Sequence, residues 1–188
     1  MGDYKGKRTF DILFSSISLI VLSPIFLIIS ILIRIFDNGP IFFKQYRIGK
    51  NNKRFLIIKF RSLPIQTPNL PSEKIGKIKI KWVGRFIRRT SIDELPQLIN
   101  ILKGEMSIVG PRPPLESQKD LIIIREKNGS INCLPGLTGL AQINAFNNMS
   151  YLEKAKYDGV YYKNISFLMD LLIIMKTFRY LLTPPPIC

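Results

Sequence analysis

Two adjacent carboxylates, Asp93 and Glu94, lie in the stretch "RRTSIDELPQLINILKGEMSIVGPRPP". Arg88 precedes them and Arg112 follows them among prolines. An ionised carboxylate can attack phosphorus and form an acyl phosphate, which divides a difficult group transfer into two easier steps. Substrate phosphates repel such a nucleophile, so arginines and Mg²⁺ must neutralise their charge. The pattern therefore indicates a phosphate-handling site, with Asp93 and Glu94 as candidate Mg²⁺ ligands.

The same carboxylates also have a structural interpretation, in which they cap a helix. Ser91 would be the N-cap and Glu94 the third helical residue of a capping box. Pro96 argues against that register, because it would be the fifth residue and would remove a helical hydrogen bond. A helix beginning at Asp93 leaves Pro96 in the first turn, where no N–H is needed. Either start places the carboxylates at the positive end of a helix, and both interpretations stay open.

The residue types available for catalysis are restricted. The chain has no histidine, so acid–base or nucleophilic chemistry must use carboxylates, Lys, Tyr, Ser or Cys. Its two cysteines, Cys133 and Cys188, form neither a metal-ligand spacing nor a disulfide framework. Their number and spacing are typical of a reducing cytoplasm.

The composition combines strong basicity with an apolar character. The 188 residues, enough for one ordinary domain, carry a net charge of +15 and are 46% hydrophobic. This combination indicates a partner that is both apolar and anionic, such as a bilayer with phosphate head groups. Nucleic acid is the competing anionic partner, but it explains neither the uncharged segment described next nor the acids within the basic region. We therefore expect membrane lipid as a partner and no nucleic acid.

The uncharged segment is Ile12–Ile33, which as a straight helix is long enough to cross a bilayer core. Pro24 interrupts it, and Ser23 can satisfy a backbone carbonyl that the proline leaves free. Basic residues flank it at both ends, which favours placing both ends on the cytoplasmic face. We expect a re-entrant helix over residues 1–36, with a kinked spanning helix as the alternative. A signal peptide is disfavoured, because no small-residue cleavage site follows.

Several further elements are indicated, and together they predict a helix-rich α+β fold. Ile41–Arg47 and Arg54–Phe60 alternate as a β-hairpin, and Leu95–Lys103 reads as a short helix closed by Gly104. The segment "KIKIKWVGRF" reads as a solvated strand or as a membrane-interface segment, and "LPGLTGLAQIN" as a glycine-punctuated loop. Helices are expected beyond Ser150. The last, "ISFLMDLLIIMKTFRYLL", is expected to pack mostly into the core, with an interfacial amphipathic helix as the alternative.

The motifs "KFRS", "GRFIRRTSIDELPQLINILKGEMSIVGPRP" and "LPGLTGLAQIN", behind a Ser-Pro-broken apolar segment, resemble the bacterial sugar transferases. These are small monotopic polyprenyl-phosphate phosphoglycosyl transferases, and the resemblance extends from Lys7 to about Arg179. It implies transfer of a sugar-1-phosphate from a UDP-sugar to undecaprenyl phosphate, with release of UMP. It also implies a phosphosugar-aspartate intermediate, a requirement for Mg²⁺, and a role in the first membrane step of surface glycan assembly. The expected location is the cytoplasmic face of the bacterial inner membrane, with residues 37–188 as the catalytic domain.

The resemblance also assigns roles to individual residues. Asp93 would be the nucleophile and Glu94 its partner, and Arg88 and Arg112 would contact phosphate. Further substrate contacts are implied at Lys59, Arg61, Thr138 and Gln142.

One departure from the family pattern concerns the residues after "AQIN". Family members often continue this motif with Gly-Arg, whereas this chain has Ala145-Phe146. A donor-contacting arginine is absent there, so the sugar does not follow from the resemblance. We also expect a minimal catalytic unit, without the multi-span N-terminal region of larger relatives. Without the resemblance, a non-enzymatic basic membrane-surface protein or nucleic-acid-binding protein is the alternative.

Overall fold

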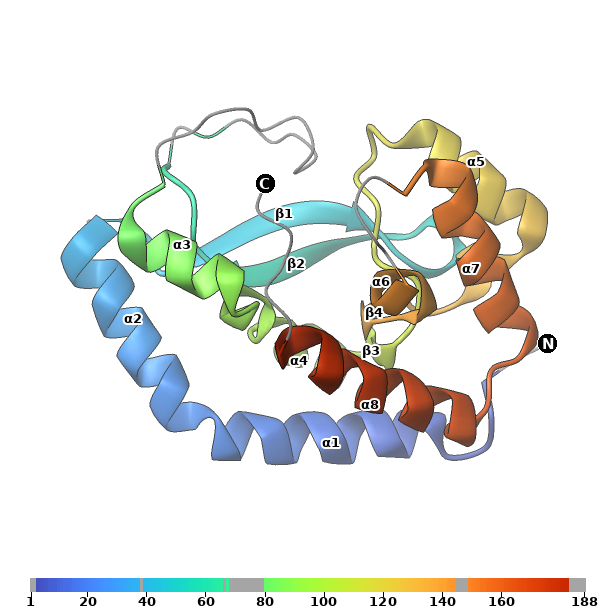
Figure 1. The fold of residues 1–188 in the computed structure, drawn as a ribbon, viewed down its shortest axis with the longest axis horizontal. Helices are drawn as coiled ribbons and strands as arrows, with labels where there is room; N and C mark the ends of the chain where they lie inside the picture. Colours follow the sequence, from blue (N-terminus) through green and yellow to red (C-terminus); the bar gives the residue numbers. More distant parts are fainter. Residues whose placement is uncertain (1–2, 38, 66, 68–79, 145–148, 183–188) are drawn as a thin grey trace.

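The protein has a helix-rich α+β fold with two small two-stranded sheets, as the sequence predicts (Figure 1). The computed structural model describes residues 3–37, 39–65, 67, 80–144 and 149–182. Two long helices form an outer L along one side of the molecule, and the sheets and the other helices lie on its inner side (Figure 1).

The outer L consists of α1 (Lys7–Val21) and α2 (Ser23–Asp37). The chain bends by 60° from one helix to the other. At the bend Ser23 Oγ donates a hydrogen bond to the Ile20 carbonyl at 2.8 Å, which satisfies an acceptor at the end of α1. The predicted break at Ser23-Pro24 is therefore confirmed. Among the described residues no single helix is long and apolar enough to cross a bilayer, although the bent pair has that length and composition when taken together.

The predicted hairpin is present as β1 (Phe42–Ile48) and β2 (Arg54–Phe60), which pair antiparallel. A 3₁₀ turn, η1 (Lys50–Asn52), joins them, with Asn51 and Asn52 at positive φ. The register places Phe43 opposite Lys59 and Arg47 opposite Phe55, so these four side chains share one face.

The remaining elements form the inner part of the molecule. In chain order they are α3 (Trp82–Arg89), η3 (Ile92–Glu94), α4 (Gln97–Lys103), β3 (Ser107–Val109), α5 (Lys119–Asn128), η4 (Ser130–Asn132), β4 (Gly136–Thr138), α6 (Leu140–Asn144), α7 (Tyr151–Lys163) and α8 (Phe167–Leu182). Gly104 ends α4 with φ 83°, as the predicted helix end requires.

Two local predictions are wrong. The described part of "KIKIKWVGRF" is not a strand, because residues from Trp82 onward form α3 and bury Val83 and Ile87, four positions apart, on one side. The segment "LPGLTGLAQIN" is not a simple loop, because it forms β4 and α6. Strand β4 pairs in parallel with β3, an interaction that joins distant parts of the chain.

Buried polar contacts attach the start of α1 to the inner elements. Lys7 Nζ lies 2.6 Å from Asp170 Oδ2 on α8, and Tyr161 on α7 donates to the other carboxylate oxygen at 2.7 Å. One turn further along α1, Asp11 accepts hydrogen bonds from the Ser107 hydroxyl and the Ile108 N–H of β3. These contacts fix the orientation of α1 relative to α7, α8 and β3.

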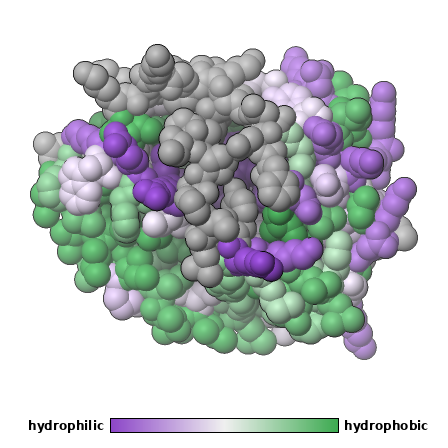
Figure 2. All heavy atoms as spheres, viewed as in Figure 1, coloured by the Kyte–Doolittle hydropathy of each residue, from purple (hydrophilic) through white to green (hydrophobic). Residues whose placement is uncertain are grey.

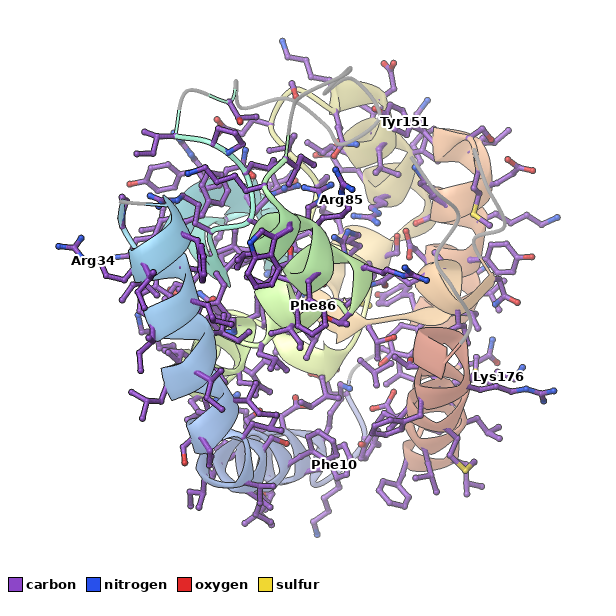
Figure 3. All side chains as sticks on the ribbon, turned by 60° about the vertical axis from the view of Figure 1, so that its left-hand side comes forward. Phe10, Arg34, Arg85, Phe86, Tyr151 and Lys176 are labelled. Atoms are coloured by element: carbon purple, nitrogen blue, oxygen red, sulfur yellow. The ribbon has the colours of Figure 1, made fainter. Side chains whose placement is uncertain are left out.

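The apolar side chains of α1 and α2 are largely exposed. Figure 2 shows hydrophobic atoms over the lower and left sides of the molecule, where Figure 1 places these two helices. In Figure 3 Arg34 on α2 and Lys176 on α8 point outward on opposite sides, with Phe86 of α3 between them in this view. The exposed set continues onto α3 with Trp82 and Phe86.

The expectation that the last helix packs mostly into the core is wrong. Only Ile173 and Ile174 among the described apolar residues of α8 are buried. Its exposed apolar residues are Phe167, Leu168, Leu171, Leu172, Met175 and Phe178. Because Asp170 and Lys7 form an ion pair on the inner side of α8, the longer apolar stripe faces outward.

Candidate active site

The carboxylate pair lies in a short turn in front of α4, not in the helix itself. Ser91 has φ 56° and precedes the 3₁₀ turn η3, which contains Asp93 and Glu94. Helix α4 begins only at Gln97, with Pro96 as its N-cap. The Ser91 side chain makes no capping hydrogen bond, so neither the capping box nor the helix start at Asp93 is correct. The Glu94 N–H donates to the Ser91 carbonyl at 3.1 Å, so the pair belongs to this 3₁₀ turn and not to α4.

Glu94 is held by two cations. Lys59 Nζ on β2 lies 2.7 Å from its Oε1, and Arg112 donates from Nη2 to Oε1 at 2.6 Å and from Nη1 to Oε2 at 3.3 Å. Burial raises the pKa of Glu94, but Arg112 and Lys59 outweigh it and hold the pKa well below its usual range. Glu94 is therefore ionised at every physiological pH.

Asp93 has a different environment, although it is adjacent in sequence. It lines a cavity of about 220 Å³, and no hydrogen bond or ion pair reaches its carboxylate from the described residues. Burial and the charge of Glu94 raise the pKa of Asp93 to about 6, while Lys59, Arg88 and Arg112 act in the opposite direction. Two neighbouring carboxylates thus have pKa values moved apart, which is typical of catalytic acids and nucleophiles.

The described lining of the cavity is strongly cationic. Asp93 is its one acidic residue, and its basic residues are Lys44, Arg47, Lys59, Arg61 and Arg88. Apolar residues from β1, β2 and the following segment complete the lining: Phe42, Phe43, Phe60, Leu63, Pro64 and Ile65. A carboxylate among five cations is suited to a ligand that carries several negative charges.

The arginines and lysine predicted from sequence come from three different elements. Lys59 is the penultimate residue of β2, Arg61 follows the strand and is 5% exposed, and Arg88 belongs to the last turn of α3. A Cβ at position 39 would collide with the guanidinium of Arg61, so a larger residue there would have to displace this side chain. The structure therefore brings Lys59, Arg61 and Arg88 together around Asp93.

Arg112 reaches the pair from the Gly-Pro-Arg-Pro turn. Its two-point contact uses the carboxylate of Glu94, and its side chain is 50% exposed. The backbone of the turn is held from behind, where Arg125 of α5 donates to the Arg112 carbonyl at 2.9 Å. Arg125 in turn pairs with Asp158 of α7 at 2.7 Å, and both of these side chains are buried.

Thr138 and Gln142 lie elsewhere. The Thr138 hydroxyl contacts the Thr177 hydroxyl of α8 at 2.6 Å, and Gln142 donates to the Leu137 carbonyl at 3.1 Å. Neither residue lines the cavity, although the Thr138 carbonyl accepts from the N–H of Gly110, next to the Arg112 turn. Ala145 and Phe146, which replace the Gly-Arg common in the family, lie outside the described residues.

The carboxylates of the site determine whether it can hold Mg²⁺. No group of three His, Cys, Asp or Glu side chains among the described residues is arranged to hold a metal ion. Among the described residues, Asp93 and Glu94 are the two carboxylates available at the site, and Glu94 is already shared between two cations. Mg²⁺ commonly binds one or two carboxylates and completes its shell with phosphate and water oxygens. The pair fits Mg²⁺ in this form, with Asp93 as the more accessible ligand.

Sequence reasoning missed three residues that shape the site. Arg47 lines the cavity, and Arg125 with Asp158 supports the Arg112 turn. Arg47 carried only a weak signal, its place in the basic hairpin. The two members of the buried pair are 33 positions apart, so no local pattern could have identified it.

A cationic cavity that holds Asp93, with the ionised Glu94 next to it in the chain, is an enzyme-like arrangement for phosphate chemistry. The family model described as bacterial sugar transferase matches residues 3–184 of this chain. The chain therefore belongs to the bacterial sugar transferase family, as the resemblance implied.

Similar proteins include transferases with named substrates. The chain is 38% identical to the exopolysaccharide production protein ExoY of Sinorhizobium fredii, over 92% of this chain and 83% of that protein. It is 39% identical to the UDP-glucose:undecaprenyl-phosphate glucose-1-phosphate transferase of Klebsiella pneumoniae, over 91% of this chain and 39% of the relative. It is 35% identical to the undecaprenyl-phosphate galactose phosphotransferase of Salmonella typhimurium, over 94% and 40%. The chain thus spans about two fifths of the length of these two enzymes.

Proposed function

We propose that this protein transfers a sugar-1-phosphate from a UDP-sugar to undecaprenyl phosphate in surface glycan assembly. The substrate classes are those in the names of its Klebsiella and Salmonella relatives. The observation that carries the proposal is Asp93, a carboxylate without a bound partner among the described residues, in a cavity with five basic side chains. That environment suits a nucleophile that must approach a diphosphate.

The proposed reaction has two steps. The Asp93 carboxylate attacks the phosphorus that carries the sugar, the bond from that phosphorus to the bridging oxygen breaks, and UMP leaves with this oxygen. A phosphate oxygen of undecaprenyl phosphate then attacks the same phosphorus, and the Asp93 carboxylate is the leaving group. Arg88, Arg61 and Lys59 neutralise the phosphates during both steps.

Glu94 has a positioning role in this proposal. Because its pKa is held low, it stays charged and fixes Lys59 and Arg112 at the edge of the cavity. When bound by Asp93 and Glu94, Mg²⁺ would supply further neutralisation of phosphate charge. Two adjacent carboxylates thus take different roles because their surroundings differ.

The location of the substrate suggests how the protein lies in the membrane. We infer that residues 1–36 enter the bilayer and return at the Ser23-Pro24 bend, while residues 37–188 lie on the cytoplasmic face of the inner membrane. The 60° bend, the exposed apolar residues of α1 and α2 and the basic flanks support this arrangement. The exposed stripe of α8 fits an interfacial helix that lies beside it.

The proposal is tested by UMP release from a panel of UDP-sugars with undecaprenyl phosphate and Mg²⁺. We expect one or more donors to give turnover with wild type and none with Asp93→Asn. Asparagine has nearly the same shape and removes a charge that burial disfavours, so the variant should unfold at the same temperature or a higher one. Turnover by Asp93→Asn at near the wild-type rate would refute the assignment of the nucleophile.

A further inference from the structure

Arg47 is a cavity residue whose charge is not used by any contact described so far. It lies on β1 opposite Phe55, on the same face as Gln45 and Lys59, and it lines the cavity together with Asp93. The side chain is half-buried between the hairpin and the Arg112 turn.

The hydrogen bonds of Arg47 all go to neutral acceptors. Nη2 donates to the side-chain oxygen of Gln45 at 2.8 Å, and Nη1 donates to the Pro113 carbonyl at 3.3 Å. Nε is buried and has no hydrogen-bond partner among the described residues. No described carboxylate pairs with this guanidinium, since the nearby Glu94 is already bound by Lys59 and Arg112.

Burial and a neighbouring positive charge disfavour the charged form of the Arg47 side chain. Burial and the charge of Arg112 lower the pKa of Arg47 to about 10, against a smaller opposite effect of Glu94. A half-buried cation beside another cation costs free energy unless an anion compensates it. The missing counter-charge is therefore expected in the ligand.

A purely structural role would be to attach the hairpin to the Arg112 turn. That attachment exists without the Arg47 side chain, because the Ile48 N–H donates to the Pro114 carbonyl at 3.0 Å. Arg125 holds the Arg112 carbonyl from the opposite side at 2.9 Å. The bond from Arg47 to Pro113 is long by comparison, so it is a small part of this attachment.

We propose that Arg47 binds a phosphate oxygen of a substrate in the Asp93 cavity. The inference rests on the proposed function, because the phosphate belongs either to the diphosphate of the nucleotide donor or to the lipid acceptor. A hydrogen bond between a guanidinium and a phosphate is charge-assisted, and Nε with one Nη forms the fork that phosphate oxygens match.

The test compares Arg47→Gln and Arg47→Lys with wild type in two kinetic arms. One arm varies the UDP-sugar at saturating undecaprenyl phosphate, and the other varies undecaprenyl phosphate at saturating donor. We expect Arg47→Gln to raise KM by about tenfold or more in the arm whose phosphate Arg47 binds, with a smaller change in kcat. Arg47→Lys should restore only part of the loss, because lysine cannot form the fork.

Arg54→Gln is the matched control. Arg54 lies on the same hairpin, pairs with Glu116 at 2.8 Å, is more than half exposed and does not line the cavity. Its KM values should equal those of wild type. Values of KM within twofold of wild type for Arg47→Gln in both arms would overturn the proposal, as would a change in kcat alone. A lowered unfolding temperature with unchanged KM would assign Arg47 to structure and overturn it equally.

A binding measurement separates this inference from the proposed function. Calorimetric titration with UDP gives the donor arm without turnover, and undecaprenyl phosphate in the same detergent gives the acceptor arm. If wild type and Arg54→Gln release no UMP from any donor, the proposed function fails. If both are active and Arg47→Gln binds both ligands as wild type does, only the role of Arg47 fails.

Discussion

At the residue scale, Asp93 and Glu94 show how surroundings determine chemistry. Both are neighbours in one 3₁₀ turn, but only Glu94 receives Lys59 and Arg112 directly. Asp93 faces the cavity, where burial and repulsion from Glu94 raise its pKa by more than the nearby cations lower it. The result is one permanently charged carboxylate and one whose charge changes near pH 6.

This difference predicts the pH dependence of the first reaction step. A raised pKa means that Asp93 gains its proton as the pH falls through about 6, and the protonated acid cannot attack phosphorus. The kcat/KM for UMP release should therefore fall about tenfold per pH unit below that value, while Glu94 stays ionised. Stopped assays between pH 5 and pH 8 measure it, with the unfolding temperature as a control for stability. A flat profile across that range would contradict the account.

Arg112 provides a second prediction at this scale. Arg112→Lys keeps the charge but loses the two-point contact to Glu94. The Glu94 carboxylate would then be oriented less precisely, and so would Lys59, which pairs with it. We expect kcat/KM to fall by about 100-fold with the fold intact. Steady-state kinetics together with thermal unfolding check it. Near wild-type kinetics would assign Arg112 to a structural role.

At the element scale, several features follow from local sequence and others do not. The hairpin, the Ser23-Pro24 break and the helix end at Gly104 were all predictable, since alternation, proline and glycine act within a few residues. The parallel pair of β3 and β4 was not, because Ser107 pairs with Gly136 far along the chain. The α3 helix was obscured because the alternating Lys-Ile pattern runs directly into it.

In the candidate active site, too, the sequence predicts local motifs but not contacts between distant segments. Asp93, Glu94 and the cations Lys59, Arg61 and Arg88 were predicted from motifs. The structure gathers Asp93 and the three cations at one cavity, and Glu94 is paired with Lys59. Their supports are contacts between distant segments, such as Asn100 of α4, which bonds the backbone of Leu56 and Ile58 and so sets β2 beside the Asp93 turn. No local pattern marks these partners, so the sequence cannot identify them.

The pair Arg125–Asp158 gives a prediction for such a support. Asp158→Asn leaves the Arg125 guanidinium buried without its carboxylate, which should cost about 3–5 kcal/mol of unfolding free energy. Because Arg125 also holds the Arg112 carbonyl, the variant should lose activity even below its unfolding temperature. Asp120→Asn, at an exposed position on α5, is the matched control for the same chemical change. Equal stability of the two variants would show that the buried pair is not needed.

At the scale of the whole molecule, the proposed arrangement has the outer L of α1 and α2 attach the catalytic part to the bilayer. The contacts of Lys7 and Asp11 fix its base against α7, α8 and β3. The apolar residues beyond that base face outward, on the same molecule as a cavity for charged phosphates. This combination suits a reaction between a water-soluble donor and a lipid-bound acceptor.

The orientation of the L is testable. Both flanks of the apolar segment are basic, so a cysteine introduced by Asp3→Cys should react only with reagents that reach the cytoplasm. Labelling in intact cells and in inside-out vesicles measures this, in a background with Cys188→Ser. Replacing Ser23 and Pro24 by alanine removes the cause of the bend and should move part of the population to the spanning orientation. Labelling of position 3 from the periplasm in the parent protein would contradict re-entry.

The central claim is that Asp93 carries the phosphosugar between the two substrates. The most direct measurement is mass spectrometry of the peptide that contains Asp93, after incubation with the active UDP-sugar and no lipid acceptor. The account predicts released UMP, a mass increase equal to one sugar phosphate on that peptide, and loss of the adduct with hydroxylamine or on addition of undecaprenyl phosphate. An unmodified peptide, under conditions in which adding lipid gives full turnover, would contradict it and indicate direct transfer between the two substrates.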